Sequence, residues 1–225
     1  MEHPILFLDL LFGSFGIHIP PHVTYTWIII LILAGLGLLA SRSISLVPKG
    51  AQNVFELVIG GLEDFMVEIT GEEGRSFFPF IATFFLFIMF CNLIGLLPGF
   101  LSPTSNINTT LSLALCTFVY THYLGIKYHG AKYIKHFLGP IPALAPLFFP
   151  IEIIGHFARV LSLTLRLFGN IMGEDLVLAI LLFLAGQFLA PLPMMFLAVF
   201  TSVVQAFVFT LLSMMYFAGS MEHAH

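Results

Sequence analysis

The sequence predicts an all-α polytopic membrane protein with about five transmembrane helices, an interfacial amphipathic helix and a long tilted helix pair at the C-terminal end. The first observation is that hydrophobic residues make up 59% of the 225 residues. The second is that charged residues make up only 9%, whereas a soluble domain carries about a quarter. The third is that apolar stretches recur, several near the roughly 20 residues that span a bilayer. We therefore expect one transmembrane domain over residues 1–225.

Three stretches in the first half of the chain are predicted membrane spans. They cover residues 24–41, 77–101 and 107–127, and within the third only His122 interrupts the apolar run before its end. Residues 48–70 differ, because apolar side chains recur there at helical spacing while acidic side chains lie between them. That pattern is typical of an interfacial amphipathic helix rather than a span.

The C-terminal region divides at Pro-Leu-Pro, residues 191–193, a sequence that favours a turn between two helices. We expect a long helix over 150–190 and a last helix over 194–221. A helix of 40 residues is roughly 60 Å long, about twice the ~30 Å hydrocarbon core. The long helix must therefore tilt steeply, bend, or run partly along the membrane plane. Residues 136–149 contain three prolines and predict an irregular link that follows the membrane.

The basic residues predict the orientation of the chain. Six of the eight cations lie in the links that follow the first and third spans: Arg42, Lys49, Arg75, Lys127, Lys132 and Lys135. The positive-inside rule makes both links cytoplasmic. Residues 1–23 are then an external N-terminus, and five crossings leave the C-terminus at residues 221–225 in the cytoplasm.

The other two cations, Arg159 and Arg166, lie inside the predicted long helix, where an ionisable side chain costs about 2.5–3.5 kcal/mol on insertion scales. At 100° per residue, every strongly polar side chain from 152 to 174 falls on one narrow face, with Asp175 outside it. The residues of this polar face are Glu152, His156, Arg159, Arg166, Asn170 and Glu174. A polar seam that only joins helices rarely needs two arginines, two acids and a histidine. The face therefore indicates a path for ions.

The order of charges along this face predicts how such a path works. Glu152 lies at the predicted cytoplasmic end, and Glu174 lies roughly 33 Å further along the helix, towards the outside. Arg166 lies between them, and arginine keeps its proton in proteins, so it blocks a proton wire that Lys or His would carry. We expect two aqueous half-paths that do not join. Gln205 on the last helix is a neutral candidate to hydrogen-bond the arginine.

The run SLTLRLFGNIMGEDLVLAI, Ser162–Ile180, resembles the signature of the subunit a family of proton-translocating F-type ATP synthases. Three further pieces agree in order and spacing: Pro150-Ile151-Glu152, the run Pro103–Asn108, and the run Val204–Phe209. The resemblance covers essentially the whole chain from about residue 24.

This resemblance implies a non-catalytic subunit in a bacterial cell (inner) membrane. It would be the static part of a rotor–stator motor, and Arg166 would face the carboxylates of a ring of c subunits. The implied partners are this ring, the b subunits of the peripheral stalk, the rest of the ATP synthase and the lipid bilayer. The polar face and the resemblance together assign proton translocation to Arg166, Glu174, Asp175, Asn170, Gln205, Glu152 and His156.

The chain departs from the family pattern in the outward half-path. Some members place the acid five residues after the Asn, whereas here Glu174 is four after and Asp175 supplies a second acid, so either could be the proton relay. Some members carry His or Glu seven residues before the Gln, where this chain has Ala198. The outward half-path therefore has fewer protonatable groups.

Two other classes of protein fit the sequence less well. A self-contained secondary transporter predicts internal repeats or paired broken helices, which the sequence does not show. A structural or quinone-binding subunit of a respiratory complex predicts cofactor-ligating histidine pairs, and His122, His129 and His156 show no facing arrangement. No basic patch could hold nucleic acid, and Cys91 and Cys116 have no metal-ligand spacing, so we read both as small buried hydrophobes and expect no cofactor or metal.

Overall fold

The computed structural model describes residues 20–42, 51–97, 99–130, 133, 145–185 and 191–221, and this part of the chain is helical with connecting turns. Its helices are α2 (Pro21–Arg42), α3 (Ala51–Thr70), η1 (Glu72–Ser76), α4 (Phe78–Ile94), η2 (Pro103–Ser105), α5 (Ile107–His129), α7 (Ala145–Ala185) and α8 (Pro191–Met221). Among them, α2, α7 and α8 are long and apolar enough to cross a membrane, and α4 is a shorter apolar helix. The predicted all-α membrane fold is confirmed.

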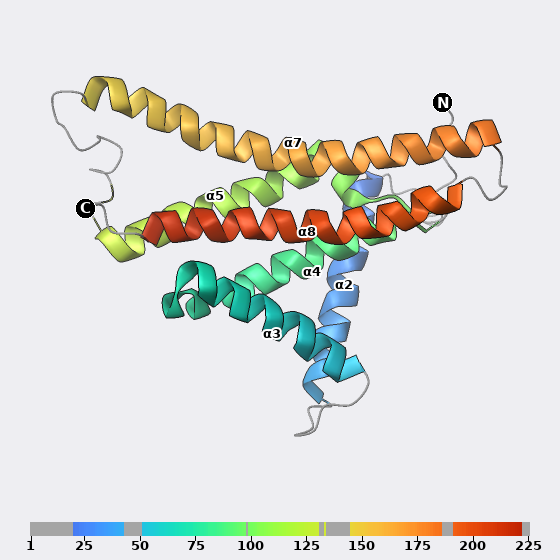
Figure 1. Cartoon of the computed structure of the whole chain (residues 1–225), viewed down its shortest axis with the longest axis horizontal. Coiled ribbons are helices and arrows are strands. Elements are labelled where there is room, and N and C mark those ends of the chain that lie inside the picture. The colour runs from blue at the N-terminus through green and yellow to red at the C-terminus, as the bar shows by residue number, and fades with distance from the viewer. Residues whose placement is uncertain are drawn as a thin grey trace.

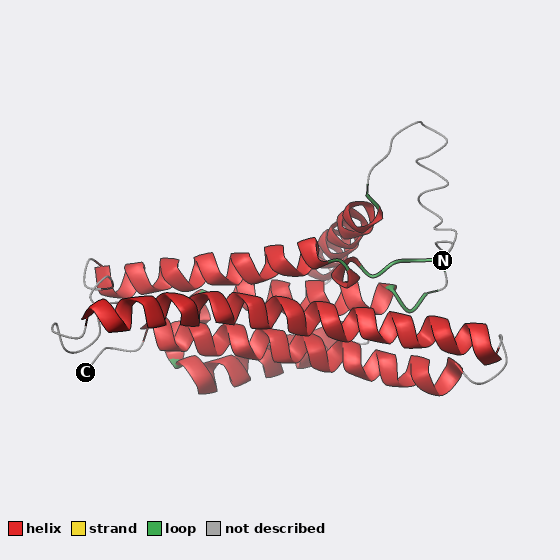
Figure 2. Cartoon of the chain, turned by 90° about the horizontal axis from the view of Figure 1, so that it is seen from above, coloured by secondary structure: helices red, strands yellow, loops and turns green. Residues whose placement is uncertain are grey.

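Helices α4, α5, α7 and α8 run side by side and form an elongated bundle (Figures 1 and 2). Helix α8 lies at its centre, because it packs against α3, α4, α5 and α7. Helix α3 lies along the lower edge of the bundle, and α2 crosses the bundle steeply, in contact with α4 and η2 (Figure 1).

The lengths of the helices explain this crossing. Helix α2 has 22 residues and is about 33 Å long, so it can span the ~30 Å hydrocarbon core with its axis along the bilayer normal. Helix α7 has 41 residues and is about 60 Å long. Since α2 runs steeply across the bundle (Figure 1), the two cannot both follow the bilayer normal. The bundle is the part that must tilt, because only a tilted helix of that length stays within the membrane.

Aromatic and aliphatic side chains fill the space around α8. Phe77 meets Phe217 edge to face, with ring centroids 5.4 Å apart, and Phe80 stacks on Tyr120 at 4.4 Å. Such pairs contribute about 0.5–1.5 kcal/mol each beyond the area that they bury. The fully buried members of this core include Met66, Ile81, Ile88, Leu167, Phe209, Met214 and Phe217. Packing in this core fixes the faces that α7 and α8 present to each other.

A buried hydrogen-bond network joins α4, η2 and α8. Asn92 Nδ2 donates to the carbonyl of Ser202 at 3.3 Å, and the Thr104 hydroxyl donates to Asn92 Oδ1 at 2.6 Å. Ser102 Oγ donates to the carbonyl of Cys91 at 2.8 Å. Buried polar groups are stabilising only when their partners are present, so this network sets the spacing of the three elements.

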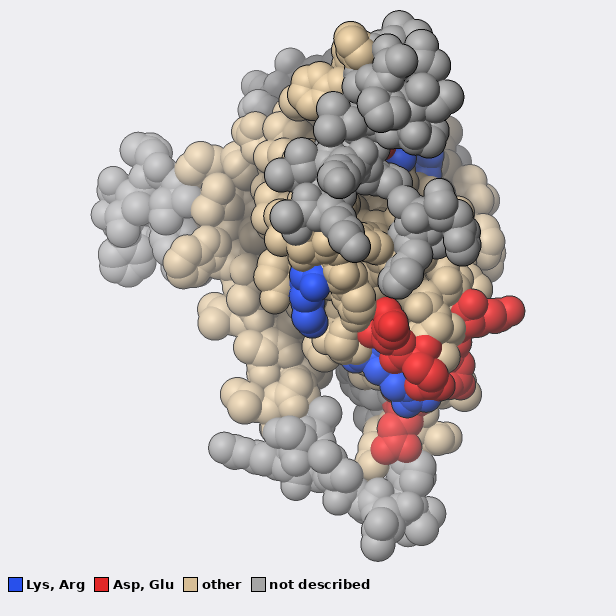
Figure 3. All heavy atoms as spheres, turned by 90° about the vertical axis from the view of Figure 1, so that its left-hand side faces the viewer, with Lys and Arg blue, Asp and Glu red and all other residues tan. Residues whose placement is uncertain are grey.

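One end of the molecule is strongly charged. The acidic side chains of α3 and η1 gather there over one side of the surface (Figure 3). Arg75 bridges two of them, at 3.0 Å from Glu63 and 2.8 Å from Glu72. The end of α5, the start of α7 and the end of α8 lie at this same end of the bundle (Figure 1). The charged end is therefore suited to water.

Three prolines lie inside helices rather than at the boundaries that were expected for them. Helix α7 begins at Ala145, so residues 145–149 are helical rather than part of an irregular link, and Pro150 lies inside the helix. Pro150 is past the first turn, so it leaves the hydrogen bond from residue 150 to the carbonyl of Pro146 unmade, and the helix continues through it. Pro191 and Pro193 fall in the first turn of α8 rather than in a turn before it.

Other expectations meet the structure only in part. The second apolar stretch forms a helix only as far as Ile94, and turns follow it. Cys91 is buried as expected, but Cys116 is exposed on α5. Several expectations concern parts of the chain outside the described residues: the N-terminus over 1–19, the link over 136–144, the C-terminal residues 222–225, and Lys49, Lys132 and Lys135.

The close approach of α4 to η2 makes a testable prediction about Gly95. An added Cβ would lie 2.7 Å from Ser102 Cβ and 3.1 Å from Ser102 N, so Gly95→Ala must displace the buried network. We expect a cost of about 1–3 kcal/mol, measured as a lowered midpoint of thermal unfolding in detergent. Gly37→Ala is the matched control, because nothing lies within 4 Å of its Cβ. Equal midpoints for the two variants would contradict this account of the contact.

Candidate functional site

The polar face of α7 runs along the rim of its buried side. Its members differ in burial: His156 and Glu174 are buried, Glu152 is half-buried, and Arg159, Arg166 and Asn170 are exposed. The buried side itself carries Leu163, Leu167 and Ile171, which face the core. The predicted face therefore exists as one line of side chains, and this line divides a packed side of α7 from an uncovered one.

Arg166 lies on the uncovered side. Its Nη2 is 3.5 Å from Ser162 Oγ, one turn earlier on the same helix. Within the described part of the chain, no carboxylate lies within 4.0 Å of its guanidinium. Gly169 and Gly173 lie on this side too, and an added Cβ would meet no atom within 4 Å at either position. The guanidinium therefore faces an open surface made of small side chains.

Asn170 and Gln205 join α7 to α8 beside the arginine. Asn170 Nδ2 donates to Gln205 Oε1 at 2.6 Å, and Gln205 is 4% exposed. The glutamine was expected to hydrogen-bond the arginine, but its partner in the structure is the asparagine one turn further along α7. The asparagine therefore ties Gln205 to the rim next to the guanidinium.

Glu174 and two groups of α8 form a set of buried polar atoms. Both carboxylate oxygens of Glu174 lack a hydrogen-bond partner among the described residues, as do Ser202 Oγ and Gln205 Nε2. Since α7 and α8 are antiparallel (Figure 1), the turn after Asn170 lies opposite the turn before Gln205. Buried polar atoms without protein partners are places where water binds. Asp175, the second acid, is only half-buried.

A second cluster lies at the charged end, between α5 and α7. His156 Nε2 is 3.3 Å from Glu152 Oε1. The ring centroids of His156 and His122 lie 4.9 Å apart, and His122 Nδ1 is 2.8 Å from the Tyr133 hydroxyl. The expectation that these histidines do not face each other was wrong, because helical periodicity says nothing about how α5 packs on α7. The available signal was the ionisable His122 inside an apolar span.

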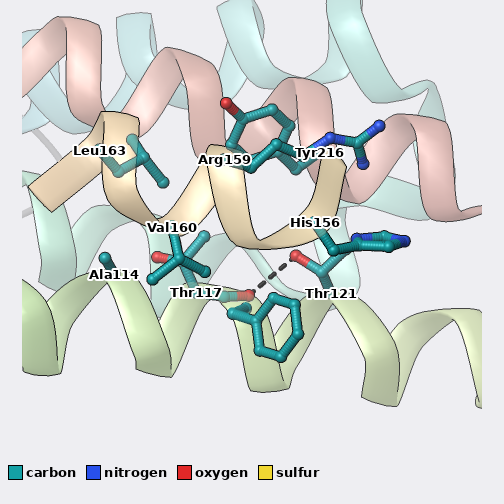
Figure 4. Close-up of a pocket in the computed structure, with 9 residues that line it drawn as sticks. Ala114, Thr117, Thr121, His156, Arg159, Val160, Leu163 and Tyr216 are labelled. Atoms are coloured by element: carbon teal, nitrogen blue, oxygen red, sulfur yellow. Dashed lines mark hydrogen bonds between the residues drawn. The ribbon is translucent and has the colours of Figure 1, made fainter. Parts of the chain in front are cut away.

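Arg159 lies beside this second cluster. Its guanidinium is 5.5 Å from the centre of the Tyr216 ring on α8, a cation–π distance. Figure 4 shows Arg159, His156 and Tyr216 around a small pocket whose floor is the Thr117 and Thr121 side of α5. The described residues hold no group of three His, Cys, Asp or Glu side chains placed to bind a metal ion.

Comparison with known proteins agrees over the length of the chain. The ATP synthase A chain family matches residues 23–218. The chain is 62% identical to the ATP synthase subunit a of Syntrophobacter fumaroxidans and 59% identical to that of Desulfosudis oleivorans. It is 52% identical to that of Citrifermentans bemidjiense, and all three alignments cover 100% of both chains.

These matches span the fold and both polar clusters, and they agree with a multi-pass helical protein whose polar groups lie within its helices. The chain therefore belongs to the ATP synthase A chain family and is a non-catalytic membrane subunit of the ATP synthase complex.

Proposed function

We propose that this chain is the static half of the ion-translocating motor, with Arg166 between two offset proton half-channels and facing a ring of c subunits. The observation that carries the proposal is the environment of Arg166. Its guanidinium is exposed on an uncovered side of α7, and no carboxylate of the described chain lies within 4.0 Å. A permanent cation at membrane depth is costly unless it has a partner, so its partner belongs to another chain.

The surface around Arg166 suits a helix that moves past it. Ser162, Gly169 and Gly173 share the uncovered side of α7, and small side chains let two helices approach closely in a membrane. A carboxylate on a passing helix is neutral in lipid and ionises beside the guanidinium, because a nearby cation favours the charged form. Each passing acid therefore releases its proton at this point.

The outward half-channel is assigned to the buried polar atoms between α7 and α8. Glu174 is preferred over Asp175 as its proton relay, because Glu174 is buried with both oxygens lacking described protein partners. Gln205 and Asn170 continue the line from Glu174 towards Arg166. Ala198 is 1% exposed and offers no protonatable group, so water and Ser202 complete the path.

The cytoplasmic half-channel is assigned to Glu152 and His156 at the charged end of the bundle. Their side chains contact each other at 3.3 Å. Arg166 separates this pair from Glu174 along α7, and arginine does not release its proton, so protons cannot pass directly between the half-channels. They cross only by riding on the ring. Each charge that crosses contributes about 2.3 kcal/mol per 100 mV of membrane potential.

The orientation follows from the same division. The subunit lies in the inner membrane of a bacterial cell. The charged end with Glu152 faces the cytoplasm, the N-terminus lies outside, and the C-terminus lies in the cytoplasm. The b subunits of the peripheral stalk would hold the chain still against the turning ring.

The role of Arg166 predicts a double effect of Arg166→Ala. The variant should assemble, because the side chain is exposed and its hydrogen bond to Ser162 is long. ATP-driven proton pumping in inverted membrane vesicles should fall to background, and passive proton leak should rise because the barrier between the half-channels is gone. Arg75→Ala is the matched control, since exposed ion pairs contribute at most about 1 kcal/mol. Normal pumping by Arg166→Ala would remove the proposed mechanism.

The choice between the two acids predicts unequal effects of isosteric variants. Glu174→Gln removes the buried carboxylate and keeps its shape, whereas Asp175→Asn does the same at the half-buried neighbour. The measurement is the rate of ATP synthesis driven by an imposed proton gradient. We expect this rate to fall by roughly one to two orders of magnitude in Glu174→Gln and by much less in Asp175→Asn. The reverse order would assign the relay to Asp175.

A further inference from the structure

We propose that His122 and Tyr133 extend the cytoplasmic half-channel onto the α5 side of the bundle, so that protons pass along Tyr133, His122, His156 and Glu152. The inference rests on the proposed function, because it adds two groups to the half-channel assigned there to Glu152 and His156. It assigns a role in proton transfer to two residues that lie outside the polar face of α7.

The four groups form a continuous chain of contacts. The Tyr133 hydroxyl is 2.8 Å from His122 Nδ1, the centroids of the two histidine rings are 4.9 Å apart, and His156 Nε2 is 3.3 Å from Glu152 Oε1. Each step is short enough for direct transfer or for transfer through one water. The chain bridges two helices that are separate in sequence, so it depends on the packing of α5 against α7.

The surrounding side chains hold the α5 half of this chain in place. The edge of His122 meets Phe118 at 4.3 Å between ring centroids. The Tyr133 ring lies directly on Gly125, where an added Cβ would overlap it, and Tyr133 is 8% exposed. Burial raises the pKa of the Tyr133 phenol, so the group stays protonated near neutral pH and can both donate and accept a hydrogen bond. A side chain held in a fixed geometry is better suited to proton relay than a mobile histidine on the surface.

The chemistry of these groups conserves protons at each step. An imidazole accepts a proton on one ring nitrogen and releases one from the other, and a phenol hydroxyl passes a proton by accepting one and donating its own. Among the described residues, the titratable and charged neighbours of the histidine pair include Tyr133 beside α5, Glu152 and Arg159 on α7, and Tyr216 on α8. Arg159 and His156 line the same pocket (Figure 4), and the fixed positive charge of Arg159 opposes a lasting charge on the imidazole. A proton on His156 can pass to Glu152, whose carboxylate contacts it.

The test compares His122→Gln with His129→Gln in inverted vesicles that contain the whole ATP synthase. Glutamine keeps a hydrogen-bonding side chain near Tyr133 but cannot carry a proton at neutral pH. His129 lies on the same helix, in its last turn, and is not a member of the four-residue chain. ATP-driven pumping should fall roughly tenfold in His122→Gln, less than for loss of a direct acid–base catalyst because water partly replaces a relay. Pumping should be unchanged in His129→Gln.

Chemical rescue separates a relay from a structural role. In inverted vesicles the cytoplasmic face is outside, so added imidazole should restore much of the pumping of His122→Gln and should not affect the control. Wild-type pumping in His122→Gln, or a loss that imidazole does not restore, would overturn the relay. If Arg166→Ala is inactive in the same assay, either result leaves the proposed function standing. Normal pumping in Arg166→Ala would show instead that the proposed function had failed.

Discussion

The structure depends on one constraint: the hydrophobic helix α7 must carry the permanently charged guanidinium of Arg166. Such a charge cannot be neutralised by losing its proton, and lipid does not solvate it. Among the described residues, the only hydrogen-bond contact of the Arg166 side chain is a long one to Ser162, and the adjacent surface is open and carries small side chains. This arrangement fits the proposed function, in which the counter-charge comes from another chain and leaves again. A fixed carboxylate within the chain would prevent that exchange.

The rest of the bundle places this charge at a boundary. Helix α8 packs against four other helices, and Leu163, Leu167 and Ile171 of α7 pack into the same core, so this side of α7 faces inward. The polar side chains therefore stay on the rim, where the members near the two ends are buried or half-buried and those between them are exposed. Glu174 and His156 are buried: His156 contacts Glu152 on its own helix, whereas both Glu174 oxygens lack a hydrogen-bond partner among the described residues. A single helix can in this way connect two buried clusters to one exposed cation.

The sequence predicted the features that depend on local composition and periodicity. Apolar stretches marked the helices, and the 100° repeat placed Glu152 to Glu174 on one face of α7. Features that depend on packing between helices were not predictable in this way. The Asn170–Gln205 bond and the His122–His156 contact both join helices whose relative rotation no single helix determines. Pro150 was read as a boundary because proline usually interrupts helices, but α7 begins at Ala145 and continues through it.

The central claim is most directly tested by disulfide cross-linking between α7 and the ring. In a background without Cys91 and Cys116, a cysteine at Ser162 would be oxidised against one placed beside the ring carboxylate, with Leu163→Cys as the matched neighbour. Ser162 is exposed on the open side, whereas Leu163 is 2% exposed and faces the core. The account predicts a cross-linked product from position 162 and none from 163. A product from 163 alone would mean that the arginine side of α7 does not face the ring.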